Sequence, residues 1–278
     1  MKPDEAPATE TAGAQTLRRG LGILKLLARS QPGGLGISEI GRRVGLSKAT
    51  AVRLTRTLMD EKFVSQDPET RAYRLGPESF AVGLAAAPTY PLQRLAAPVL
   101  RSLALETGDW VFFSVLQGFE SICLSRESGD IPYPASALKI GDRHPLGVGA
   151  GGLALLAALA DDEVETALAH NAQLIARLYR HSPLPVIREL VRETREKGYC
   201  VIPGIIVPGY WALGVPLVQR DGRPVAAIVL VTSETRLNVM RRAVLGERML
   251  RLSRELMARA EDGGGKFEAR GEGVGRGM

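Results

Sequence analysis

Between residues 37 and 58, apolar side chains recur at intervals of three and four, the spacing that places them on one face of a helix. Residues 37–44 therefore predict a short helix, and residues 51–58 predict the buried stripe of a longer one. Gly45 between them can adopt the left-handed conformation that a tight turn needs, and Ser47 is a suitable cap for the second helix. Two amphipathic helices joined by such a turn indicate a helix-turn-helix.

Two short β-prone runs follow this pair of helices. Residues 63–65 and 71–75 flank the turn-forming sequence at 67–70, which contains a proline, and this pattern predicts a hairpin that would form a wing. A further helix at residues 16–31 precedes the pair and ends at Pro-Gly-Gly. Its expected buried side consists of Leu17, Leu21, Leu24 and Leu27.

The outward face of the second helix carries side chains suited to DNA. A helix-turn-helix places this helix in the major groove. Its cations can reach phosphates or guanine edges, and its small apolar groups can touch thymine methyls. Wing residues can reach the neighbouring backbone or the minor groove. The predicted DNA-contacting residues are Ser47, Lys48, Ala49, Thr50, Val52, Arg53, Arg56, Arg71, Tyr73 and Arg74.

The charge distribution supports this interpretation. The chain has 278 residues and a formal net charge of +6. Residues 15–76 hold 12 Lys or Arg against 5 Asp or Glu, whereas residues 77–278 carry a net charge of only +1. A basic excess confined to the predicted module provides the sequence-independent part of nucleic-acid affinity. The alternative is that these arginines form an ordinary solvated surface.

The rest of the chain predicts a second, α+β domain. Residues 77–87 read as a linker helix, and from residue 91 onwards helices and strands are interspersed, with a strong hairpin signal at Asp221-Gly222. Hairpin-linked strands flanked by helices favour an antiparallel sheet. The expected strands are 109–117, 120–126, 134–140, 199–203, 211–219 and 224–232, and the expected helices are 91–107, 148–160, 161–179, 183–197 and 235–260.

The predicted domain organisation has five parts. Both ends are rich in Pro, Gly or charged residues and cannot bury enough apolar surface to offset the entropy of ordering. The prediction is a disordered N-terminus at 1–14, a winged helix-turn-helix at 15–76, a linker helix at 77–90, an α+β domain at 91–260 and a disordered tail at 261–278.

Several longer motifs occur in order along both halves of the chain. They are SEIGRRVGLSKATAVRLTRTL with KFV and YRLG, LQRLAAPVLRSLALETGDWV, KIGDRHPLGVGAGGLALLAAL, VRETREKGYCVIPG and ALGVPLVQRDGRPVAAIVLV. Through these motifs the chain resembles the IclR family of bacterial transcriptional regulators. The resemblance implies a GAF/PAS-like effector-binding domain and a homodimer or dimer of dimers on a near-palindromic operator in double-stranded DNA. The chain departs from the family pattern at Ala49 and in the apolar run 205–209.

A glycine-rich run at residues 147–152 marks the candidate effector site. It formally matches GxGxxG, but the sequence around it does not predict the βαβ unit of a dinucleotide site. The remaining alternatives are close packing of a helix on a sheet, or a helix N-terminus that holds an anion. In the family this loop borders the effector pocket. An apolar pocket with one anion-binding end suggests a small aromatic or aliphatic carboxylate. The predicted effector-binding residues are Leu146, Gly147, Val148, Gly149, Ala150, Ile206, Tyr210 and Trp211, although Trp211 could instead be a core residue.

Other classes of function find little support in the sequence. It contains no GxSxG, HExxH or Walker motif, and its Cys and His residues are not clustered as metal ligands. We therefore expect no enzyme activity, cofactor or metal. Cys123 and Cys200 lie in apolar runs, which fits buried thiols in a reducing cytoplasm. No membrane span or signal peptide is expected. The sequence predicts an effector-responsive, DNA-binding transcriptional regulator; the alternatives are an architectural DNA-binding protein and an enzyme with a DNA-binding module.

Overall fold

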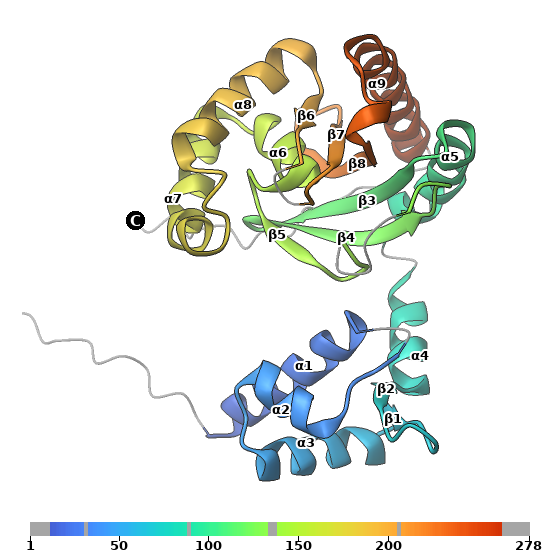
Figure 1. Cartoon of the computed structure of the whole chain (residues 1–278), viewed down its shortest axis with the longest axis vertical. Coiled ribbons are helices and arrows are strands. Elements are labelled where there is room, and N and C mark those ends of the chain that lie inside the picture. The colour runs from blue at the N-terminus through green and yellow to red at the C-terminus, as the bar shows by residue number, and fades with distance from the viewer. Residues whose placement is uncertain (1–11, 31–32, 88–89, 133–137, 205–206, 263–278) are drawn as a thin grey trace, which may run out of the picture. The chain divides into compact units, whose positions relative to one another are not determined.

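The computed structural model describes residues 12–30, 33–87, 90–132, 138–204 and 207–262. The chain divides into two compact units, residues 1–89 and residues 90–278 (Figure 1). The first helix starts at Ala12 and the last ends at Asp262. Residues 12–14 and 261–262, predicted as parts of disordered ends, are therefore helical. The remainder of both predicted disordered ends lies outside the described residues.

The N-terminal unit is the predicted winged helix-turn-helix. Its small core is formed by Ile23, Leu27, Ile40, Leu54 and Val64. The two strands pair antiparallel, with Ser65 opposite Arg74. The elements are α1 (Ala12–Ala28), α2 (Ile37–Val44), α3 (Lys48–Asp60), β1 (Val64–Gln66), β2 (Tyr73–Leu75) and the linker helix α4 (Pro77–Ala86).

The buried side of α1 differs from the predicted leucine stripe. Ile23 and Leu27 are fully buried, whereas Leu17 is 63% exposed and Leu21 is 44% exposed. Residues two positions apart lie about 200° apart around a helix axis. Leu21 therefore points away from the side on which Ile23 packs. Of the four predicted leucines, Leu27 is buried in the core and Leu24 packs partly buried against it, so the prediction is wrong only for Leu17 and Leu21.

The C-terminal unit is built on one antiparallel sheet of six strands in the order β5-β4-β3-β8-β7-β6. This arrangement confirms the predicted α+β class. The prediction of a strand at 134–140 is not confirmed: residues 133–137 lie outside the described residues, and residues 138–140 are not in a strand. The strands are β3 (Trp110–Gln117), β4 (Glu120–Glu127), β5 (Arg143–Pro145), β6 (Cys200–Ile202), β7 (Tyr210–Val218) and β8 (Pro224–Ser233).

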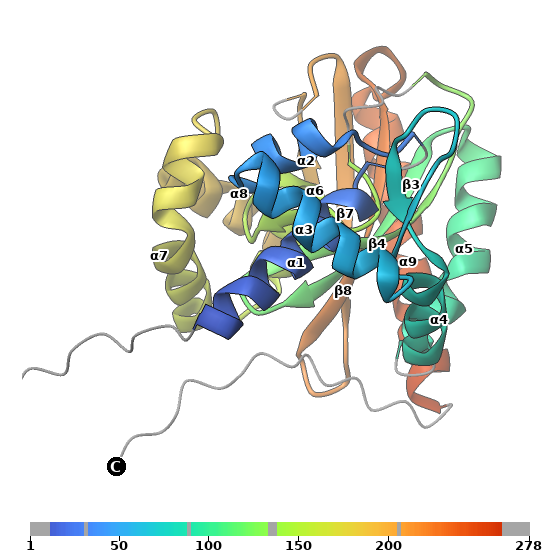
Figure 2. The same ribbon diagram turned by 90° about the horizontal axis from the view of Figure 1, so that it is seen from below.

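Helices cover both faces of this sheet (Figures 1 and 2). One core lies between the sheet and α6, α7 and α8, and a second lies between the sheet and α5 and α9. Adjacent strand residues point to opposite faces, so Phe112 belongs to the first core and Phe113 to the second. The helices are α5 (Pro91–Thr107), α6 (Gly149–Ala157), α7 (Asp161–Leu178), α8 (Leu184–Lys197) and α9 (Val239–Asp262). None of the described helices has both the length and the apolarity that crossing a membrane requires.

Candidate DNA-binding surface and candidate effector cavity

The turn between α2 and α3 sets the orientation of the exposed face of α3. Gly45 ends α2 with φ +69°, the left-handed conformation that the sequence predicted. Ser47 then caps α3, because its hydroxyl accepts a hydrogen bond from the Thr50 amide at 3.3 Å. Ala51 and Leu54 are buried on the inner side of α3. The opposite side, which carries the predicted DNA-contacting residues, consequently faces solvent.

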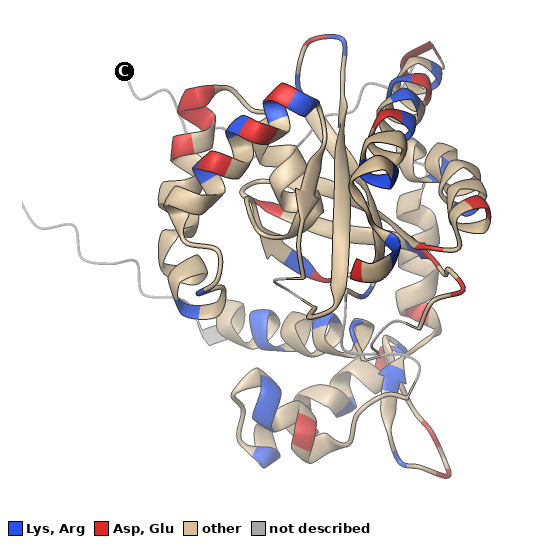
Figure 3. Ribbon diagram, turned by 45° about the horizontal axis from the view of Figure 1, so that its top comes forward, with Lys and Arg blue, Asp and Glu red and all other residues tan. Residues whose placement is uncertain are grey.

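The cations of the N-terminal unit divide into paired and unpaired groups. Arg42 and Arg43 on α2 both bind Glu39, and their hydrogen bonds lower the pKa of that carboxyl to about 2. Lys48, Arg53 and Arg56 on α3 are exposed, and no side chain of the described residues forms an ion pair with them. Basic positions outnumber acidic ones on the helices of this unit (Figure 3). Three cations that form no ion pair with a described residue therefore lie on the predicted recognition face.

The wing residues have unequal roles. The Asp67 carboxylate accepts hydrogen bonds from the amides of Glu69 and Thr70, which closes the turn, and Arg74 binds the same carboxylate at 3.2 Å. Arg71 is exposed beside the tip, with φ +58°. Tyr73, in contrast, packs partly buried against the core of this unit. The Arg71 side chain is thus exposed to solvent, whereas Tyr73 and Arg74 also contribute to the structure of the wing.

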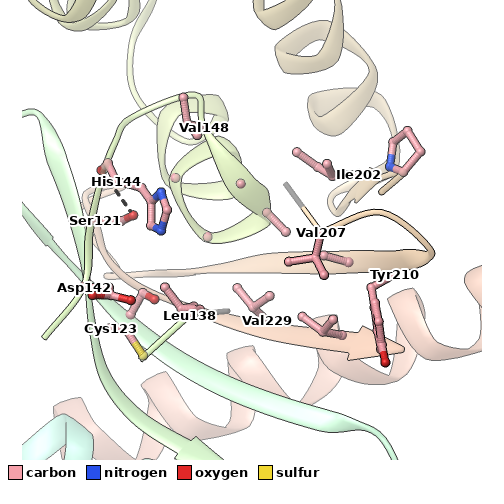
Figure 4. Close-up of a pocket in the computed structure, with 18 of the residues that line it drawn as sticks. Ser121, Cys123, Leu138, Asp142, His144, Val148, Ile202, Val207, Tyr210 and Val229 are labelled. Atoms are coloured by element: carbon pink, nitrogen blue, oxygen red, sulfur yellow. Dashed lines mark hydrogen bonds between the residues drawn. The ribbon is translucent and has the colours of Figure 1, made fainter. Parts of the chain in front are cut away.

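A cavity of about 410 Å³ lies between the sheet and the N-terminus of α6 (Figure 4). Apolar side chains from several strands and loops form much of its wall, and polar groups gather around Asp142 and His144. The described residues that line it are Ser114, Ser121, Cys123, Leu138, Asp142, His144, Val148, Gly149, Ala150, Gly151, Gly152, Ile202, Pro203, Val207, Pro208, Tyr210, Ala212, Val229 and Val231.

The glycines of α6 allow this helix to approach the sheet closely. A Cβ atom on Gly152 would lie 3.0 Å from the Pro145 carbonyl oxygen, and one on Gly151 would lie 3.2 Å from Val229. Gly214 on β7 has even less room, since its Cβ would lie 2.4 Å from the Ala150 carbonyl oxygen. Close packing of the helix on the sheet therefore explains these glycines, and the same segment borders the cavity.

The topology argues against the dinucleotide interpretation. The short strand β5 precedes the glycine-rich run, but the next strand along the chain, β6, lies at the opposite edge of an antiparallel sheet. A dinucleotide fold requires two neighbouring parallel strands around the helix. What remains is a helix N-terminus that opens into the cavity and has no side-chain cap.

The predicted effector residues separate into three groups. Val148, Gly149, Ala150 and Tyr210 line the cavity. Leu146 is fully buried in the core, and Gly147, with φ +90°, packs against Ile187 behind the loop. Ile206 lies outside the described residues.

The prediction that Trp211 closes the pocket is wrong. It belongs to the core on the α5 and α9 side of the sheet, and Arg242 lies 4.0 Å from the centre of its ring. Its neighbour Tyr210 points to the cavity side, as strand alternation requires. The alternative, a core tryptophan, describes its position.

The sequence reasoning missed the polar part of the cavity. Asp142 and His144 sit in the turn and short strand just before the glycine-rich run, and His144 shares a hydrogen bond of 3.2 Å with the Tyr179 hydroxyl. Burial, together with the nearby Asp142 charge, raises the pKa of the Cys123 thiol to about 12. The sequence Asp-Arg-His at residues 142–144 indicated polar side chains close to the glycine-rich loop. Their position beside the cavity did not follow from it, because strand β5 was not predicted.

Both cysteines of the C-terminal unit are buried. Cys200 is buried and its sulfur donates to the Ala150 carbonyl, and burial raises its pKa to about 12. Both cysteines are free thiols. Within the described ranges, no group of three or more His, Cys, Asp or Glu residues is placed to hold a metal ion.

Comparison with known proteins covers almost the whole chain. Residues 16–68 match the IclR helix-turn-helix domain, and residues 85–258 match the C-terminal domain of bacterial IclR transcriptional regulators. The transcriptional repressor IclR of Escherichia coli is 30% identical over 92% of this chain and 93% of its own length. The repressor AllR of Salmonella typhimurium is 29% identical over 88% and 90%.

Solved structures show the same architecture. An IclR-type regulator from Alicyclobacillus acidocaldarius superposes with a TM-score of 0.70 at 26% identity, covering 88% of this chain and 98% of that one. An IclR homolog from Microbacterium hydrocarbonoxydans, solved in complex with 4-hydroxybenzoate, gives 0.63 at 23% identity, covering 85% and 99%. Two domain matches in the expected order, a curated relative along nearly the full length and the shared fold establish that this chain belongs to the IclR family of DNA-binding transcriptional regulators.

Proposed function

We propose that this chain is a sequence-specific transcriptional regulator whose affinity for its operator is changed by a small organic carboxylate in the C-terminal cavity. The observation that carries the proposal is the pairing of two features in one chain. An unpaired basic face lies on the capped helix α3, and the uncapped N-terminus of α6 borders a cavity.

The DNA-binding part rests on which side chains are available. Lys48 and Arg53 are exposed on α3 together with Ala49 and Val52, so one surface offers charge and small apolar groups. Residues near the start of a recognition helix contact base edges. We expect Arg71 to contact the backbone or minor groove beside this site, and the tied residues Tyr73 and Arg74 to hold the wing in place.

Self-association is part of the proposal, because a near-palindromic operator requires two recognition helices. The linker helix α4 has no buried residue in this chain, and its Phe80 and Leu84 are exposed by more than half. Leu17 and Leu21 on α1 are exposed as well. Exposed apolar residues of this kind favour contact with another protein surface, and we assign it to a second copy, in a dimer or a dimer of dimers.

The effector part rests on the chemistry of the cavity. The free amides at a helix N-terminus and the helix dipole favour an anion, and Val229, Val231 and Ile202 provide an apolar wall. The volume of about 410 Å³ is in the range of small-molecule sites. A carboxylate with an apolar body fits both features. Binding of the carboxylate would shift the arrangement of the DNA-binding units, which is a coupling between two sites. The protein would act in the cytoplasm and would not convert the bound carboxylate chemically.

Selection of genomic DNA fragments by the purified full-length protein tests the proposal. We expect a near-palindromic sequence, bound at least about 10³-fold more tightly than a scrambled duplex. Adding carboxylates, with 4-hydroxybenzoate among them, should then change that affinity. Equal, weak binding of both duplexes with the same salt dependence would instead indicate an architectural protein that contacts only the backbone. Chemical conversion of a bound carboxylate would indicate an enzyme.

A further inference from the structure

One buried hydroxyl in the cavity wall forms no hydrogen bond with the described residues. Ser114 on β3 lines the cavity and is only 4% exposed. Its cross-strand neighbours are Ala227 and Cys123, and the Cys123 sulfur donates instead to the Ser125 carbonyl. A buried hydroxyl without a partner is unfavourable, because it loses its hydrogen bonds to water and gains none in return. A ligand in the cavity could supply the missing partner.

Strand β3 directs the Ser114 side chain towards the first turn of α6. Side chains alternate between the two faces of a strand, and Phe112, two positions earlier, belongs to the core on the α6 side. A Cβ atom on Gly151, the third residue of α6, would lie 3.4 Å from the Ser114 Oγ atom. The pairing of β3 with β4 also shifts its register between Phe113 and Ser114, and such irregularities are frequent next to active sites. The hydroxyl therefore lies beside the start of this helix.

The first turn of α6 requires a hydrogen-bond acceptor from outside the helix. The first amides of a helix have no partner within it, and no side chain caps α6 at Val148. The first three residues, Gly149, Ala150 and Gly151, all line the cavity. A group that binds these amides must accept hydrogen bonds, and the helix dipole favours one with a negative charge. The Ser114 hydroxyl can donate to the same group, because a serine oxygen carries a proton of its own.

We propose that Ser114 is a ligand-binding residue, whose hydroxyl donates a hydrogen bond to an oxyanion that also accepts hydrogen bonds from the amides at the start of α6. The oxyanion is a carboxylate or a phosphate, since both offer several acceptor oxygens and a negative charge. This inference rests on the proposed function, because it assigns a side chain to the anion-binding end of the same cavity. It fixes the orientation of the ligand, with the charged group beside β3 and the first turn of α6.

The first test uses the full-length protein without ligand. Ser114→Ala should leave the melting temperature unchanged or raise it, because the substitution removes a buried hydroxyl that has no partner. Thr232→Val is the control, since it removes a buried hydroxyl from the neighbouring strand β8 that donates to the Asp109 carboxylate at 2.6 Å. We expect this control to melt at a lower temperature. If Ser114→Ala lowers the melting temperature as much as Thr232→Val, the Ser114 hydroxyl has a partner within the protein and the inference is wrong.

The second test measures the binding of benzoate, hexanoate and inorganic phosphate to the full-length protein by isothermal titration calorimetry. Ser114→Ala should weaken the binding of an oxyanion at least about tenfold, because a hydrogen bond to a charged group is lost. Ser121→Ala is the matched control in the same cavity. The Ser121 hydroxyl also lies near the first turn of α6 (Figure 4), but it donates to the His144 carbonyl at 3.5 Å. We expect its loss to change the affinity less than about threefold.

The outcomes separate this inference from the proposed function. If the carboxylates bind wild type and Ser114→Ala equally, the inference is wrong and the proposed carboxylate site stands. Equal losses in Ser114→Ala and Ser121→Ala would likewise overturn the assignment to Ser114. If phosphate binds in a Ser114-dependent manner and neither carboxylate binds, the inference stands and the carboxylate proposal fails. Absence of binding by all three probes would overturn both.

Discussion

Replacing Arg53 with alanine should weaken operator binding while leaving the fold intact. Arg53 lies on the exposed side of α3, and no ion pair with a described residue engages its guanidinium. Exposed positions without special contacts change stability by less than about 0.5 kcal/mol, and alanine is the better helix former. The effect of the substitution should therefore appear in the DNA complex rather than in the free protein.

The expected loss follows from the contact that Arg53 is placed to make. A bidentate contact between arginine and guanine contributes about 1–3 kcal/mol of discrimination. In the proposed dimer two copies of α3 are affected, so the loss per operator should be about twice that value, provided that the two distant sites are additive. If Arg53 contacts phosphate instead, affinity for all sequences should fall together. The slope of log K against log salt would then decrease by about 0.9 for each lost contact.

Fluorescence anisotropy with the selected operator and a scrambled duplex, measured from about 50 to 200 mM salt, distinguishes these cases. Arg42→Ala is the matched control, because it removes the same charge from an exposed position whose guanidinium already binds Glu39. We expect it to weaken binding to both duplexes slightly and equally. Unchanged operator affinity in Arg53→Ala would refute a DNA contact by Arg53. Equal losses of operator affinity in Arg53→Ala and Arg42→Ala would show that only the positive charge matters, not its position.

Three further variants or measurements address the structure that supports the two sites. Ser47→Ala removes the cap of α3 and should lower the stability of the DNA-binding unit by about 1 kcal/mol, whereas Ser47→Gly should cost only a few tenths, as thermal unfolding would show. Gly214→Ala places a Cβ 2.4 Å from the Ala150 carbonyl oxygen and should destabilise the C-terminal unit by about 1–3 kcal/mol. Gly83→Ala is the control, because the space around Gly83 is open and the substitution should not destabilise the protein. Equal melting curves for the two variants would contradict the packing argument. The raised pKa of Cys123, about 12, means that the native state holds the thiol proton more tightly than the unfolded chain, so this group's contribution to stability is present below the ordinary value of 9.0 and is lost as the pH rises towards 12. Alkylation of native Cys123 by iodoacetamide should accordingly stay slow at about pH 9, where an ordinary thiol reacts readily, and fast labelling would count against the burial.

The DNA-binding module was predictable because its determinants are local. Gly45 ends α2, Ser47 caps α3, and the buried and exposed faces of α3 follow from residues within three turns of one another. The turn at Asp67 is equally local, since its side chain binds amides two and three positions further on. In such segments each hydrogen-bonded partner lies only a few positions away in the sequence, so the sequence pattern is sufficient to predict the local structure.

Errors arose where tertiary contacts select among similar local patterns. In α1 the predicted residues Leu24 and Leu27 lie on the core side, but Ile23 is buried where Leu17 and Leu21 were expected, because α2 and α3 pack against that side. The edge strand β5 is only three residues long and is held by pairing with β4. Its sequence, Arg-His-Pro, has no strand preference of its own, so neither β5 nor the location of His144 and Asp142 followed from local propensity.

The cavity itself arises from the alternation of residues along β7. Leu213, Val215 and Leu217 face the core beneath α5 and α9, which places Tyr210, Ala212 and Gly214 on the α6 side. Ala212 and Gly214 are small, so α6 can approach at Gly214 while a space stays open above Ala212. Tyr210 and Trp211 could not both border that space, because adjacent strand residues point to opposite faces. The sequence alone shows that Trp211 lies on the same face of β7 as Leu213, Val215 and Leu217. Which of the two faces α6 covers depends on contacts with residues some sixty positions away in the chain. Those contacts determine that Tyr210, and not Trp211, borders the cavity.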